Sequence, residues 1–329
     1  MTTGADKTRT PLLERGVHVD SWDRAGRIAA YGAALAMLPY LLIKVSWVAG
    51  SLLGAGGGSG TAEWVVLNSA TIGMAGVGIA VALALVRSWG MRIPGAPLVV
   101  CAWVGTGFLV PVLPYALLGW LLVPADGRGG SGSDAGPSMP GWEAALIQFG
   151  FVGMGAGLAV ALPAYLRRRW PEAFAGRLGD GGERSPKTPP WTAVVGAAVG
   201  LVWLYWAVGG TAGVAHPEER ELSWHLLSGV FGCWALVASA ASWAVVRGLP
   251  ARARRWVPMV LGWLGSGSLF AWSGWKLPFT LYLAITQPAG TALPENLVLA
   301  AVLHLAAVGT GAAMLGALIR TLPSAARSR

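Results

Sequence analysis

The sequence predicts an all-α fold, a polytopic membrane helix bundle of eight transmembrane helices arranged as two parallel four-helix repeats. Three observations predict it. Hydrophobic residues make up 54% of the 329-residue chain and charged residues only 12%, about half the charged fraction of an ordinary soluble domain. Long apolar runs recur along the whole chain, and lysine and arginine are concentrated in alternate connections between them.

The apolar runs define the eight expected helices in chain order. Each run has about the 20 residues needed to cross the hydrocarbon layer of a bilayer. The third and seventh runs contain Pro111, Pro114 and Pro278, so we expect both helices to be kinked or broken near their outer ends. A polar stretch precedes the first run, and no cleavable signal peptide is expected there. The expected spans are 28–53, 64–86, 96–123, 144–166, 191–214, 224–246, 256–285 and 296–319.

The basic residues predict the orientation. Of the 24 lysines and arginines, 20 lie on the side that holds both termini and the even-numbered connections, Arg128 and Arg220 lie on the other side, and Lys44 and Lys276 lie within spans. Basic residues favour the cytoplasmic side, so both termini are expected in the cytoplasm and the chain in the plasma membrane. The expected organisation is a cytoplasmic tail (1–27), a first four-helix repeat (28–166), a cytoplasmic linker (167–190), a second repeat (191–320) and a cytoplasmic tail (321–329).

Acidic and tryptophan residues mark the outer side. Glu143 and Glu295 stand where even-numbered spans begin, and a carboxylate there complements the positive end of the helix dipole. That structural role suffices to explain them. Trp64 and Trp224 fall at outer ends of spans, as an interfacial aromatic belt requires. The Gly/Ser-rich external stretch Pro124–Gly141 is expected to be a flexible linker.

The two halves resemble one another at a shift of about 160 residues. Trp47 aligns with Trp206, Trp64 aligns with Trp224, and Val152-Gly-Met-Gly-Ala156 aligns with Val308-Gly-Thr-Gly-Ala312. Each half holds an even number of spans, so both insert in the same direction, and we expect a pseudo-two-fold axis along the membrane normal. Paired Gly-x-Gly sites are expected to mark close helix contacts: Gly105/Gly107, Gly153/Gly155, Gly265/Gly267 and Gly309/Gly311.

A short motif carries a family resemblance. The stretch Leu204-Tyr-Trp-Ala-Val-Gly-Gly210 resembles the Tyr-Trp-Ala-Leu-Gly-Gly signature of small four-helix membrane proteins of unknown function from actinobacteria. The first half has the degenerate copy Val45-Ser-Trp-Val-Ala-Gly-Ser51. The resemblance covers one helix in each half and implies a tandem fusion of two such units in a bacterial membrane protein. It implies no catalytic residues.

Several function classes are disfavoured. The basic residues form no continuous basic face, so no nucleic-acid partner is expected. Cys101 and Cys233 lie in apolar runs without CxxC spacing and are expected to be buried thiols. Haem ligation by His304 and His225 would require equal depths, but His225 stands much nearer the start of its helix. No metal or cofactor is therefore expected.

Polar residues inside apolar runs are the candidate site, because ionisable groups are costly within a membrane. Lys44 and Lys276 either extend their ammonium groups to the outer interface or belong to a site. His304 either packs through a hydrogen bond or binds a ligand, and Gln148 is its counterpart in the first half. Asn68 is similarly paired with Ser228.

These groups all fall in the outer half of the expected spans. The leading hypothesis is therefore a non-enzymatic membrane protein with a polar, net-positive cavity open to the outer leaflet, which binds or moves an anionic or lipid-like ligand. Two alternatives stay open: an accessory or scaffold protein that docks a protein partner through Arg167–Pro190 or the N-terminal tail, and an intramembrane enzyme. The residues expected to form the cavity are Lys44, Asn68, Gln148, Lys276 and His304.

Overall fold

The protein is described from a computed structural model that covers residues 21–53, 62–122, 141–170, 175–180, 191–286 and 294–321. Most of both predicted tails, all of the linker 124–141 except Gly141 and much of the linker 167–190 lie outside these residues. The described ranges contain isolated bridges but no β-strand, which confirms the all-α prediction. The helices are α1 (Ser21–Leu52), α2 (Ala62–Ala84), α3 (Gly95–Leu122), α4 (Gly141–Arg169), α6 (Trp191–Ala207), α7 (Leu222–Arg247), α8 (Trp256–Thr286) and α9 (Leu297–Arg320).

Six of these helices are long and apolar enough to cross a membrane: α1, α2, α3, α4, α7 and α9. The other two differ for separate reasons. α6 is apolar but only 17 residues long. α8 has 31 residues, but serine, glycine and tryptophan replace aliphatic residues along it. Multi-pass helical character is therefore confirmed, and spanning by α6 and α8 stays a prediction.

The outer surface of the bundle is apolar. Leu35, Val66, Val194 and Leu305, which come from four different helices, are 63% to 68% exposed. Exposed apolar side chains are individually common in soluble proteins, but here they recur around the bundle and cover its sides. Lipid is the solvent that such a surface requires.

The helix ends differ from the expected boundaries in two instructive places. α1 begins at Ser21, inside the predicted tail. Its first two turns are helical although they contain polar residues. α6 ends at Ala207 although the sequence stays apolar beyond it, because Gly209 adopts φ +98° and turns the chain out of the helix. The prolines within α3 and α8 do not break either helix.

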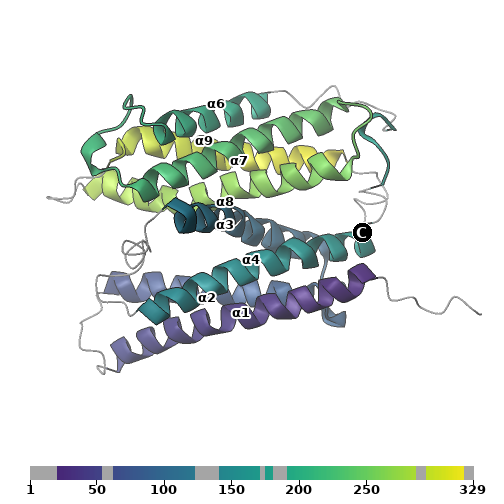
Figure 1. The fold of residues 1–329 in the computed structure, drawn as a ribbon, viewed down its shortest axis with the longest axis horizontal. Coiled ribbons are helices and arrows are strands. Elements are labelled where there is room, and N and C mark those ends of the chain that lie inside the picture. The colour runs from purple at the N-terminus through teal and green to yellow at the C-terminus, as the bar shows by residue number, and fades with distance from the viewer. Residues whose placement is uncertain are drawn as a thin grey trace, which may run out of the picture.

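The helices form two groups that meet along α3 and α8 (Figure 1). In the first group α1 packs against α2 and α4, and α3 packs against α4. In the second, α7 packs against α6 and α8, and α9 packs against α8 and α6. Each group has a hydrophobic core of its own, centred on residues such as Met154 and Tyr165 in the first and Ala235 and Met314 in the second.

The contact between α3 and α8 depends on paired glycines. A Cβ atom on Gly107 would lie 2.2 Å from the carbonyl oxygen of Gly267, and one on Gly267 would lie 2.7 Å from the carbonyl oxygen of Trp103. The Trp103 indole donates a hydrogen bond to Ser266 Oγ at 3.1 Å. The backbones therefore touch, as small residues permit between membrane helices. Of the predicted glycine contacts, those at Gly105 and Gly309 are wrong, since nothing lies within 4 Å of a Cβ there.

Candidate functional site

A polar pocket lies among α6, α7, α8 and α9. Its volume is about 40 Å³, room for about three waters at ~10–15 Å³ each. The walls are mainly aromatic, and the polar groups come from α7, α8, α9 and Glu295, two residues before α9. The lining residues are Trp203, Trp206, Trp224, Leu227, Ser228, Phe231, Ser268, Leu269, Trp272, Ser273, Lys276, Glu295, Ala300, Leu303 and His304.

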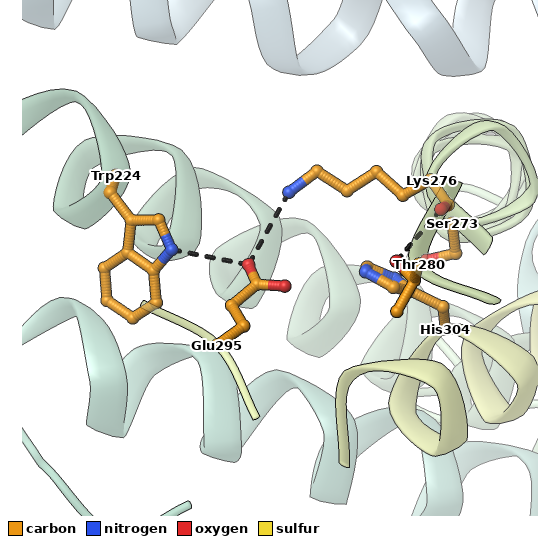
Figure 2. Close-up of polar contacts among 6 residues, drawn as sticks. All are labelled: Trp224, Ser273, Lys276, Thr280, Glu295 and His304. Carbon is orange, nitrogen blue, oxygen red and sulfur yellow. Dashed lines mark hydrogen bonds and ion pairs between the residues drawn. The ribbon is translucent and has the colours of Figure 1, made fainter. Parts of the chain in front are cut away.

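An ion pair occupies the mouth of this pocket. Lys276 Nζ of α8 lies 3.8 Å from Glu295 Oε1, and the two side chains are 39% and 23% exposed. The Trp224 indole donates a hydrogen bond to the same carboxylate oxygen at 3.3 Å. Figure 2 shows Lys276 and Trp224 approaching Glu295 from opposite sides. The carboxylate thus has one cationic and one neutral donor.

Backbone contacts hold Glu295 in place. Val214, beyond the end of α6, forms an isolated antiparallel bridge with Glu295, and the Ala215 amide donates to the Pro294 carbonyl at 2.8 Å. Asn296 follows directly as the N-cap of α9, and its side chain accepts from the backbone amides of Val298 and Leu299. The early end of α6 is therefore what allows the chain to reach and fix the glutamate.

His304 lies deeper in the same pocket. It is 5% exposed, and its Nδ1 lies 3.3 Å from Ser273 Oγ. Its ring also packs against Trp203, with centroids 6.2 Å apart. The Thr280 hydroxyl donates to the Lys276 carbonyl at 3.0 Å. Ser273 and His304 thus line the pocket beneath the ion pair, whereas Thr280 does not line it (Figure 2).

Lys44 and Asn68 form a separate buried pair between α1 and α2. The Lys44 ammonium donates to Asn68 Oδ1 at 2.8 Å and lies 4.7 Å from the centroid of the Trp47 ring. Asn68 in turn donates to the Trp64 carbonyl at 2.8 Å. Lys44 is 3% exposed, so the interpretation that it merely extends outward is wrong for this lysine.

The five predicted site residues therefore do not form one cavity. Lys276 and His304 line the pocket, Lys44 and Asn68 lie in the other helix group, and Gln148 is exposed on α4. The sequence identifies polar positions but not which helices become neighbours. The pocket is also not net-positive as expected, because the Glu295 carboxylate faces the Lys276 ammonium.

Sequence reasoning missed Glu295 and Trp224 as site residues. A role at a helix end explains each of them in the sequence, since Glu295 complements the helix dipole and Trp224 fits an interfacial belt. A usable signal was present, because a lysine inside a membrane is usually paired and Glu295 is the first acidic residue after Lys276 in the sequence.

Among the described residues, no group of three His, Cys, Asp or Glu side chains could hold a metal ion.

The same aromatic geometry occurs in both helix groups. Trp47 and Trp64 have ring centroids 6.4 Å apart with planes at 34°, and Trp206 and Trp224 have centroids 6.1 Å apart with planes at 36°. Trp64 and Trp224 are each the third residue of their helices. The pocket of the second group and the Lys44 site of the first are therefore built around matching indole pairs.

Comparisons of the chain with protein-family models, with curated proteins and with solved structures find no match.

Proposed function

We propose that this integral membrane protein binds or moves an anionic or lipid-like ligand at the pocket that contains Lys276, Glu295 and His304. One observation carries the proposal: a partly exposed ion pair stands at a pocket with polar groups inside a bundle of apolar helices. Ionisable groups are rarely kept within membrane helices without a function. The exposed lysine can meet an anionic group, and the tryptophan walls can pack against an apolar chain.

The proposed membrane arrangement has eight spans, with both termini in the cytoplasm and the pocket toward the outer leaflet of the plasma membrane. The distribution of lysine and arginine supports this orientation. Spanning by α6 is supported by its outward apolar side chains, including Val194 and Leu201 at 63% and 58% exposure. Spanning by α8 is supported by Leu281 and Ile285, at 45% and 82%.

The proposed domain organisation is a tandem pair of four-helix units, 28–166 and 191–320, that resemble the actinobacterial four-helix proteins. The matching indole pairs support it. So does the contact of Gly107 with Gly267, because these residues are 160 positions apart and would be equivalent. In a two-fold arrangement, equivalent residues meet at the axis.

Replacing Lys276 by methionine should remove ligand-dependent stabilisation. The test measures thermal unfolding of the purified full chain in detergent with dioctanoyl phosphatidylglycerol, dioctanoyl phosphatidylethanolamine or inorganic phosphate. A ligand present at 100 times its Kd stabilises a protein by about 2.7 kcal/mol, so at least one probe should raise the wild-type midpoint. The Lys44→Met variant is the matched control and should keep the shift, because Lys44 lies outside the pocket. No shift with any probe, or an equal shift in Lys276→Met, would contradict the proposal.

A further inference from the structure

The first helix group contains an internal ammonium group in an aromatic site. Lys44 Nζ lies over the Trp47 ring at 4.7 Å and over the Tyr40 ring at 5.8 Å, and it donates to Asn68 at 2.8 Å. Aromatic faces attract cations, most strongly where water is excluded. Here the chain itself supplies an amine to a site formed by the Trp47 and Tyr40 rings and by Asn68 of α2.

The second helix group repeats part of these walls around a cavity, although Val199 stands where Tyr40 does in the first group. Trp206 and Trp224 repeat the indole pair, and Ser228 is the seventh residue of α7 as Asn68 is the seventh of α2. The difference lies in the first helix of each group. Lys44 stands three residues before Trp47, but Trp203 stands three residues before Trp206, so α6 brings no amine to its own site.

The second site instead has a carboxylate. Glu295 lies in the cavity wall and accepts from the Trp224 indole. Its cationic neighbour Lys276 comes from α8, lies 3.8 Å away and is 39% exposed. That separation exceeds an ordinary charge-assisted hydrogen bond of about 2.7–2.9 Å. The carboxylate can therefore accept a closer ammonium group while Lys276 turns to an anion beside it.

We propose that the pocket among α6, α7, α8 and α9 binds a phosphoethanolamine group, with its ammonium between Glu295 and the Trp206–Trp224 indoles and its phosphate on Lys276. This inference rests on the proposed function and names its ligand class. Lys44 in the first group is the internal counterpart of the ligand's ammonium. The pocket has room for the ammonium and its two-carbon linker, so the phosphate would lie at the mouth beside Lys276, whose Nζ is 3.8 Å from Glu295.

A primary ammonium is favoured over a quaternary one for two reasons. Lys44 is itself a primary ammonium that donates a hydrogen bond, and Glu295 offers an acceptor that a quaternary group cannot use.

The experiment measures binding of dioctanoyl phosphatidylethanolamine, phosphatidylcholine and phosphatidylglycerol, and of free phosphoethanolamine, to the purified full chain by native mass spectrometry. We expect phosphatidylethanolamine to bind most tightly, and Glu295→Gln to weaken it by roughly tenfold to a hundredfold. Glu143→Gln is the matched control, since Glu143 also opens an outer helix end but lies in the first turn of α4. It should leave the affinity unchanged. If free phosphoethanolamine also binds, the headgroup alone suffices. If phosphatidylethanolamine binds and free phosphoethanolamine does not, the acyl chains contribute to the affinity. The proposed recognition of the headgroup holds in both cases.

Two other outcomes separate this inference from the proposed function. If phosphatidylglycerol binds as tightly as phosphatidylethanolamine, and its binding depends on Lys276 but not on Glu295, the ammonium site is wrong and the proposed function stands. If no phospholipid or phosphate binds in a manner that depends on Lys276, both are wrong. A Glu295→Gln variant that unfolds is replaced by Glu295→Asp, which keeps the charge and should retain the preference for the amine.

Discussion

Replacing Gly107 by leucine should destabilise the protein more than any other single change proposed for it. The Cβ atom would lie 2.2 Å from the Gly267 carbonyl oxygen and 2.3 Å from the Gly267 carbonyl carbon. These are backbone atoms of α8, so no side chain can rotate away. The two helices must separate, which would also strain the hydrogen bond from the Trp272 indole to the Phe108 carbonyl at 2.9 Å. Overpacking of a well-packed core typically costs about 1–3 kcal/mol, and we expect a loss at or above the top of that range.

Gly105→Leu provides the matched control for this change. Gly105 lies two residues earlier on α3, and nothing lies within 4 Å of a Cβ atom built there. Its replacement should leave the free energy of unfolding nearly unchanged. Equilibrium unfolding in mixed detergent micelles measures both variants. Equal stability of Gly107→Leu and wild type would show that α3 and α8 do not meet at this glycine pair.

Replacing Asn68 by leucine should have the second largest effect. The Lys44 ammonium is 3% exposed and donates to Asn68 Oδ1 at 2.8 Å. A hydrogen bond to a charged group contributes about 1.5–3 kcal/mol, and breaking a buried charged contact by removing one partner is costlier than removing both. We expect Asn68→Leu to lower the free energy of unfolding by about 2–3 kcal/mol, within the range given for such bonds.

A double-mutant cycle separates this effect from general packing changes. Lys44→Met should cost less than Asn68→Leu, because it removes the buried charge together with its need for an acceptor. In the Asn68→Leu background, Lys44→Met should restore part of the lost stability. Costs that simply add in the double variant would contradict a direct coupling between the two side chains.

Much of the fold follows from the sequence because hydropathy acts locally. The start and end of α2, α3, α8 and α9 lie within a few residues of their expected positions, since each boundary coincides with a change from apolar to polar residues. The end of α6 could not be predicted this way. The sequence remains apolar past Ala207, and the turn at Gly209 accompanies pairing of Val214 with Glu295, far away in the chain.

The candidate site was predictable only in part. Lys276 and His304 stand out because an ionisable residue in an apolar run is unusual. Glu295 does not stand out, because its place before a helix has a sufficient explanation in the helix dipole. The sequence places Lys44 and Lys276 at a similar depth, because depth along a helix can be counted from the sequence. It does not show which helices become neighbours, so it cannot separate the two lysines. The cysteines were expected to be buried, yet Cys101 and Cys233 are both exposed, because each points away from its neighbouring helices.

The proposed function requires that the pocket beside Glu295 open to the outer side of the membrane. Cysteine accessibility tests it directly. In a background where Cys101 and Cys233 are replaced by alanine, Ser228→Cys introduces one thiol into the pocket wall. Ser239→Cys is the control, because Ser239 is buried on the same helix but does not line the pocket. The reagent is a membrane-impermeant methanethiosulfonate that carries a quaternary ammonium, added to intact cells.

We expect Ser228→Cys to be modified on intact cells and Ser239→Cys to remain unmodified. Prior addition of dioctanoyl phosphatidylethanolamine should slow the reaction at Ser228→Cys. The opposite pattern, in which Ser228→Cys reacts only after the cells are permeabilised, would place the pocket on the cytoplasmic side and contradict the proposed arrangement.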